Sequence, residues 1–153
     1  MPTTLKRVNK KLESIAECVA KRKDIVEIAA LEQGMSEMLS RIFDKGITLD
    51  GGTMGGYSNA YLLKRLKKGK NNLNKNLVFE GNLRNSIQVG KYENRNVIGF
   101  TDLDLANIAQ FQEESDIQVN EPIFGLRDNE EEEMLRILQQ GIIDTINECF
   151  KGS

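Results

Sequence analysis

The sequence predicts an α+β fold in which a small antiparallel β-sheet packs against long N-terminal and C-terminal helices. Two observations predict this class. Near both ends of the chain apolar residues recur every three or four positions, as on one side of a helix, whereas within residues 77–100 they alternate, as in a half-buried strand. A hairpin alone is barely stable in water, so we expect it to lie against the helices.

The length of 153 residues fits one domain with a substantial core. Within 1–153 we expect an N-terminal helical region (1–45), a glycine-rich and then basic loop (46–76), a hairpin with a short helix and an edge strand (77–126), and a C-terminal helix (127–150).

The N-terminal region carries two apolar stripes that are out of phase by two residues. The first is Leu5, Val8, Leu12, Ile15 and Val19, and the second is Ile28, Leu31, Met35, Met38 and Ile42. Thr3 or Thr4 is expected to cap the first stripe, and Asp24 and Glu27 have the spacing of a capping box. We infer either two helices with a break near Lys23 or one helix whose buried face rotates there.

Gly46 is expected to end this helical region, and a glycine-rich loop follows it. The loop does not match a phosphate-binding loop, because Tyr57 follows Gly56 where that motif requires lysine. We therefore interpret it as a connection. Ser58 is expected to cap a short helix over residues 59–68.

A basic segment comes next, with six cations and no acid among them. These are Lys64, Arg65, Lys67, Lys68, Lys70 and Lys75. The segment is either a solvated loop or a contact surface for nucleic acid or for an acidic region of a neighbouring subunit. Few aromatic or arginine residues are interleaved with the lysines, which favours protein contact over nucleic acid.

The predicted hairpin has Ile87 and Val89 on one strand and Val97, Ile98 and Phe100 on the other, separated by the polar run 91–96.

A short helix is expected to begin at Asp102 or Asp104 after the hairpin. Its inward residues are expected to be Leu105, Ile108, Ala109 and Phe111. Residues 122–126 are expected to form a short edge strand that begins at a proline.

The C-terminal helix is expected to be capped by Asp128 with Glu131 three positions on. Its apolar face is expected to be Leu135, Leu138, Ile142, Ile146 and Cys149. The expected core of the domain is Leu83, Ile87, Val89, Ile98, Phe100, Phe124, Leu138 and Ile142.

The formal net charge of −2 conceals a strong division along the chain: residues 1–56 carry +1, residues 57–100 carry +7 and residues 101–153 carry −10. A molecule with separate basic and acidic regions can complement another copy of itself. We expect the basic segment to face acidic residues across a subunit interface. The acidic candidates are Glu113, Glu114, Glu130, Glu131, Glu132 and Glu133.

The composition argues against catalysis. The chain has no histidine, which excludes Ser-His triads and histidine metal sites, and we expect no enzyme activity, cofactor or metal. Cys18 and Cys149 lack metal-ligand or redox spacing and are expected to be small core residues in a reducing compartment. No apolar run approaches the ~20 residues of a membrane span, so we expect a protein made in a cytoplasm without membrane contact.

One resemblance runs from about residue 57 to the C-terminal helix. It consists of Tyr57-x-x-x-Tyr61, then Leu77 with Gly81, Leu83, Arg84, Ser86 and Ile87, then Val97-Ile98-Gly99, Ala106-x-x-Ala109-Gln110-Phe111 and Pro122-x-Phe124. In this order and spacing the residues resemble the phage virion-morphogenesis, or tail-completion, family. Members often have histidine at Gln110 and arginine at Glu121, so this chain departs from the family at those two positions.

The resemblance implies a structural virion protein of a tailed phage, located at the head–tail junction or the tail end after assembly in the host cytoplasm. It also implies a homo-oligomeric ring, a hexamer or alternatively a dodecamer, in contact with head-completion or connector proteins and with tail-tube or sheath proteins. Genomic DNA in the lumen is a further possible contact. The alternative hypothesis is a small nucleic-acid-binding protein that uses the basic segment.

Overall fold

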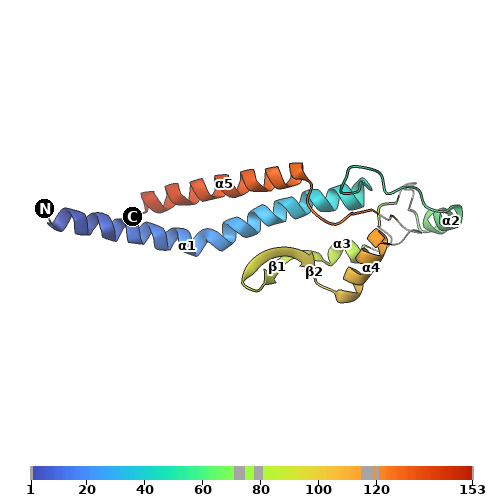
Figure 1. Ribbon diagram of the computed structural model, residues 1–153, viewed down its shortest axis with the longest axis horizontal. Coiled ribbons are helices and arrows are strands. Elements are labelled where there is room, and N and C mark those ends of the chain that lie inside the picture. The colour runs from blue at the N-terminus through green and yellow to red at the C-terminus, as the bar shows by residue number, and fades with distance from the viewer. Residues whose placement is uncertain (1, 71–74, 78–80, 115–118, 120, 153) are drawn as a thin grey trace.

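A long N-terminal helix forms the axis of an elongated molecule (Figure 1). The computed structural model describes residues 2–70, 75–77, 81–114, 119 and 121–152. Parts of the basic segment (71–74) and of the acidic loop that follows Glu114 (115–118 and 120) therefore lie outside the described residues.

Helix α1 spans Pro2–Leu39 and continues into a π-helical turn, η1, at Ser40–Asp44. Helix α5, Asp128–Lys151, packs antiparallel along one side of α1, and a hairpin of β1, Ile87–Tyr92, and β2, Arg95–Phe100, packs on α1 along the other side (Figure 1). The predicted α+β class, with a small antiparallel sheet and two long terminal helices, is confirmed.

The two stripes of the N-terminal region are two faces of one continuous helix. Val26 and Gly34 face α5, whereas Met38 and Ile42 belong to the core on the hairpin side. Of the two predicted alternatives, the structure therefore has the single helix whose buried face rotates, without a break near Lys23.

The predicted caps in this helix are wrong, because α1 already begins at Pro2, a residue that the first turn tolerates. Asp24 and Glu27 instead accept bonds from the hairpin, from Lys91 Nζ at 2.6 Å and Asn96 Nδ2 at 2.7 Å respectively. These bonds hold the hairpin on α1.

Gly46 ends η1 as predicted. Its φ is +66°, a conformation that favours glycine, and its N–H donates to the Ile42 carbonyl oxygen at 3.2 Å. A Cβ atom there would lie 2.3 Å from the Lys75 carbonyl oxygen, so the close approach of the basic segment also requires glycine.

The hairpin has the predicted strands, with Ile87 opposite Phe100 and Val89 opposite Ile98. Its two-residue turn, Glu93 and Asn94, has φ of +47° and +63°, as type I′ turns require.

The core lies where η1, the hairpin and the following segments meet. Its buried apolar residues there are Met38, Ile42, Phe43, Met54, Leu83, Ile87, Ala109 and Ile123. The predicted core positions Leu83 and Ile87 are confirmed, and Ile98, Phe100 and Phe124 pack against this cluster while half-buried. Val89 and Leu138 are also half-buried.

The part of the chain that the structure describes also contains three short helices: α2, Asn59–Lys67, α3, Asn82–Asn85, and α4, Leu103–Glu114. Asp102 starts α4 as predicted, since its carboxylate accepts the Leu105 N–H at 3.0 Å. The predicted inward face of α4 is partly wrong. Leu105 and Ala109 face the core, but Ile108 and Phe111 are exposed.

Residues 122–126 do not form the predicted edge strand, and the described sheet has two strands. The backbone groups of this segment instead form hydrogen bonds with a side chain and with a neighbouring loop. The Glu113 carboxylate accepts the N–H groups of Ile123 and Phe124 at 2.6 and 2.8 Å, and the Pro122 carbonyl oxygen accepts the Leu49 N–H at 2.8 Å. Pairing with the hairpin is therefore not needed to satisfy these groups.

The buried face of α5 agrees with the prediction at Cys149 but not at Leu135, Ile142 and Ile146, which are exposed. Gly141, Thr145 and Cys149 face α1, whereas Ile142 is 43% exposed, so Ile142 was wrongly placed in the core. Small residues face α1 because the helices approach closely: a Cβ atom at Gly141 would lie 2.7 Å from Val26 Cγ1.

Candidate functional site

The basic segment begins on α2, at one end of the long axis of the molecule (Figure 1). The Ser58 hydroxyl accepts the Tyr61 N–H at 3.4 Å and caps α2 as predicted. Lys64, Lys67 and Lys68 are exposed, whereas Lys70 and Lys75 are half-buried.

Arg65 is the exception within this segment, because it is only 1% exposed. Its guanidinium carbon lies 4.4 Å from the ring centroid of Tyr57 and 6.0 Å from that of Tyr61. The Tyr57 hydroxyl in turn accepts the Asn76 N–H at 3.1 Å. Arg65 therefore holds α2 against the preceding loop and the end of the basic segment, and it does not present its charge at the surface as the interface prediction requires.

The predicted acidic residues divide in the same way. Glu113 binds the backbone of residues 122–126, and Glu114 accepts a bond from Gln110 Nε2 at 2.9 Å on the same helix. Glu133 pairs with Arg136, and the hydrogen bond from this guanidinium lowers the pKa of the Glu133 carboxyl. Glu131 and Glu132 are exposed.

Glu130 is buried and forms an ion pair with Arg41, whose Nε lies 2.7 Å from Glu130 Oε1; each side chain is 5% exposed. The other Glu130 oxygen, Oε2, accepts the Arg127 N–H at 2.9 Å. Glu130 therefore caps the start of α5 by binding Arg127. The prediction that Asp128 caps this helix, with Glu131 three positions on, is wrong.

Arg41, the partner of Glu130, was not identified from the sequence as a residue of this site. Its Nη1 donates to the carbonyl oxygens of Ile47 and Ile123 at 3.0 and 3.2 Å, and its Nη2 donates to that of Gly125 at 2.6 Å. The pair is buried, fully bonded and surrounded by backbone, so it joins η1, α5 and residues 122–126 within the subunit.

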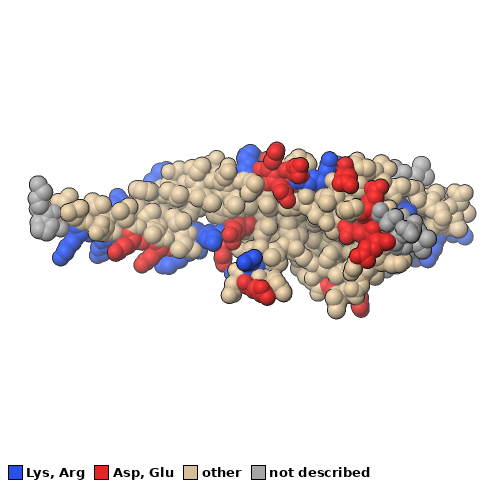
Figure 2. Space-filling view, in the orientation of Figure 1, with Lys and Arg blue, Asp and Glu red and all other residues tan. Residues whose placement is uncertain are grey.

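Acidic side chains gather over the start of α5 and near α4, and basic ones lie at the far end around α2; along the N-terminal half of α1 basic and acidic side chains both occur (Figure 2). One subunit therefore keeps Lys67 and Lys68 away from Glu131 and Glu132. Pairing between these groups requires a second copy.

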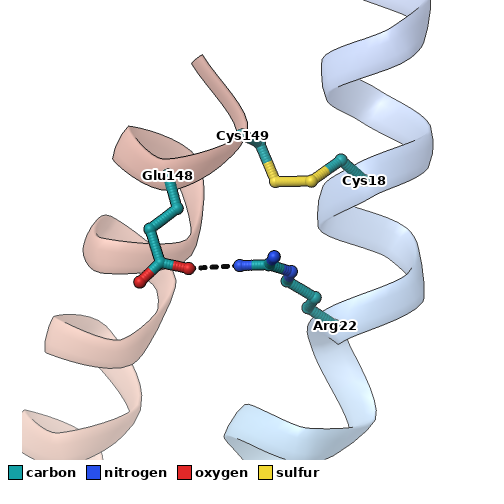
Figure 3. Close-up of a disulfide and its surroundings, with 4 residues drawn as sticks. All are labelled: Cys18, Arg22, Glu148 and Cys149. Atoms are coloured by element: carbon teal, nitrogen blue, oxygen red, sulfur yellow. Dashed lines mark hydrogen bonds and ion pairs between the residues drawn. A yellow bond between two sulfur atoms is a disulfide. The ribbon is translucent and has the colours of Figure 1, made fainter. Parts of the chain in front are cut away.

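A disulfide joins Cys18 of α1 to Cys149 of α5, with their Cα atoms 5.9 Å apart, beside an ion pair between Arg22 and Glu148 (Figure 3). The prediction that both cysteines are separate core thiols is wrong. Their separation of 131 residues hides the pairing in the sequence.

Exposed apolar residues on the two long helices are a further feature that the sequence interpretation missed. Leu5, Val8 and Leu12 of α1 are exposed, and so are Leu135, Ile142 and Ile146 of α5. The spacing of apolar residues in the sequence had predicted that all six lie on buried helix faces.

Among the described residues, no cluster of three or more histidine, cysteine, aspartate or glutamate side chains is arranged to hold a metal ion. Within the same residues, no helix has the length and apolar character to cross a membrane. Comparison of the chain with models of protein families, with curated proteins and with solved structures finds no match.

Proposed function

We propose that this chain is a structural virion protein of a tailed phage that acts in head–tail joining or tail completion as a closed homo-oligomeric ring. The observation that carries the proposal is the order of residues that resembles the tail-completion family. Several of these residues pack together: Ser86 Oγ donates to the Leu83 carbonyl oxygen at 2.7 Å, Leu83 and Ile87 are buried, and the Phe124 side chain packs against the same core. The resemblance therefore concerns residues that shape the fold.

The distribution of surface groups supports self-association. The basic end of the molecule and the acidic start of α5 lie apart, as a heterologous contact between copies requires. Lys67 and Lys68 of one copy are the cations that we assign to this contact, and Glu131 and Glu132 of the next are the acids. Each surface ion pair contributes ~0 to 1 kcal/mol, so charge sets the register while apolar contacts hold the ring.

Electron microscopy of the purified chain tests the proposal. We expect rings for the natural sequence and loss of rings for the variant Lys67→Glu/Lys68→Glu, which should remain folded because both positions are exposed. The matched control is Lys21→Glu/Lys45→Glu, which makes the same change of charge at exposed lysines outside the segment. Normal rings from the Lys67/Lys68 variant at low and physiological salt would refute this pairing, and absence of the protein from purified virions would refute the function.

The alternative, nucleic-acid binding, is supported by one observation: within the described residues, neither Lys67 nor Lys68 forms an ion pair. Against it, Tyr57 and Tyr61 contact Arg65, so base stacking on these rings would have to displace that contact. Filter binding across a salt series separates the two functions, because phosphate contacts make affinity fall steeply with salt.

A further inference from the structure

Helix α1 extends well past the end of α5. The disulfide places Cys149, near the end of α5, beside Cys18, so the first turns of α1 project beyond α5 (Figure 1). We name residues 4–12 the N-terminal arm. Its apolar side chains, Leu5, Val8 and Leu12, are 49 to 70% exposed.

The arm continues the face of α1 that binds α5. Val26 contacts Gly141, Gly34 contacts Met134 and Arg41 pairs with Glu130. Steps of three and four residues lead from these positions back through the buried Ile15 to Leu12, Val8 and Leu5. The arm therefore has the apolar surface of a helix–helix interface over a length that α5 does not cover. A helix end of this length gains little stability without such a contact.

A second exposed stripe lies on α5. Leu135, Ile142 and Ile146 are 37 to 48% exposed. Each directly follows a residue that faces α1 (Met134, Gly141 and Thr145), so it lies about 100° further round the helix. We name these three residues the outer face of α5.

The two surfaces are complementary in charge. The arm contains Lys6, Arg7, Lys10 and Lys11 and no acidic residue. On α5, three of the acids pair with arginines of the same subunit, and the exposed acids Asp128, Glu131, Glu132 and Asp144 are the ones that can face the arm. Acidic side chains gather over the start of α5, whereas along the N-terminal half of α1 basic side chains lie together with some acidic ones (Figure 2). If two arms packed against each other, the four cations of one arm would lie close to the four cations of the other and would repel them.

We propose that the N-terminal arm of one copy packs on the outer face of α5 of a second copy. Leu5, Val8 and Leu12 then cover Leu135, Ile142 and Ile146, and the cations of the arm face the acidic side of α5. The contact is heterologous, so each subunit uses its arm on one neighbour and its outer face on another. This inference names a contact within the homo-oligomer of the proposed function and rests on that proposal.

Sedimentation velocity over a range of protein concentrations tests the contact with two variants of the full chain. Leu5→Gln/Leu12→Gln impairs the arm, and Ile142→Gln/Ile146→Gln impairs the outer face. All four side chains are exposed, so both variants should keep the helical circular dichroism of the natural chain. Ile25→Gln, at an exposed residue of α1 outside the arm, is the matched control. We expect each double variant to raise the dissociation constant by about tenfold or more and the control to leave it unchanged.

Mixing the two variants identifies which surfaces meet. A heterologous contact predicts that each variant alone associates at least about tenfold more weakly than the natural chain. An equimolar mixture should form a heterodimer with the affinity of the natural contact, because the intact arm of one variant meets the intact outer face of the other. Normal association of the outer-face variant alone, or no recovery in the mixture, would overturn the arm-to-α5 contact in favour of paired arms or another surface. A natural chain that stays monomeric throughout would also overturn it. If the arm variant still forms rings, this contact is overturned but the proposed function is not. The proposed function is tested separately by the presence of the protein in purified virions.

Discussion

Replacing Glu130 with alanine should lower the free energy of unfolding by about 3 to 5 kcal/mol, the usual cost of removing one partner from a buried ion pair. The substitution removes the carboxylate that lies 2.7 Å from Arg41 Nε, and it leaves the Arg41 guanidinium buried without a counter-ion. It also removes the acceptor of the Arg127 N–H at the start of α5.

The remaining partners of Arg41 do not compensate for this loss. The carbonyl oxygens of Ile47, Ile123 and Gly125 still accept its Nη groups, but these neutral dipoles cannot replace a full negative charge in the interior. The substitution Arg41→Met should lower the free energy of unfolding by at least as much. It leaves the Glu130 carboxylate without its partner, and it also removes the donor from three carbonyl oxygens.

Urea unfolding followed by circular dichroism measures both changes. Glu131→Ala is the matched control, an exposed acid in the same turn of α5, and it should cost less than about 1 kcal/mol. The double variant Arg41→Met/Glu130→Met should lose less stability than the sum of the two single losses, because neither charge is left alone. A loss below about 1 kcal/mol for Glu130→Ala would show that the pair is not buried as described.

Three further predictions concern the long helices and the hairpin. Cys149→Ser, or reduction of the natural chain, should lower stability by up to about 5 kcal/mol, the chain-entropy value for a loop of this length; a melting temperature that does not respond to reductant would contradict the disulfide. Gly141→Val should cost about 1 to 3 kcal/mol in urea unfolding, because its Cβ atom would lie 2.7 Å from Val26 Cγ1, and an unchanged midpoint would contradict this close approach. The hydrogen bond from Lys91 lowers the pKa of Asp24, so the stabilisation is present above the unfolded-state pKa and is lost as pH falls through the folded-state pKa. Lys91→Ala should therefore raise the pKa of Asp24 in an NMR titration, and an unmoved titration would refute the contact.

Several features that depend on neighbouring residues were predicted correctly from the sequence, although the caps expected at Thr3 or Thr4, at Asp24 and at Asp128 were not. The cap at Ser58, the start of α4 at Asp102, the glycine at position 46 and the pairing of the hairpin strands were all correct. Each depends on a side chain and a backbone group a few positions apart, or on alternation within one short strand.

Features that depend on distant residues were not predicted. Arg41 and Glu130 are 89 positions apart, and nothing in the sequence around either residue indicates its partner. The buried face of α5 was misassigned because apolar side chains occur on more than one side of that helix. Gly141 and Thr145 select the face that packs on α1 because they are small, and only the structure places α1 there.

The division of charge along the chain can be read directly from the sequence, but the contacts that individual charged residues make within the subunit were not predicted. Arg65, Glu113 and Glu130 carry charges that the sequence assigned to an interface, and the structure uses each of them within the subunit. What remains for contact between copies is a smaller set of exposed charges on α2, the arm and α5, together with apolar residues whose periodicity had suggested a core.

We propose that copies of this chain associate through these surfaces into a closed assembly. Native mass spectrometry of the purified chain at rising concentration tests it most directly. A closed assembly should give one dominant oligomer of fixed subunit number that persists as concentration increases. A monomer at every concentration, or an open ladder of sizes without a closed state, would contradict it.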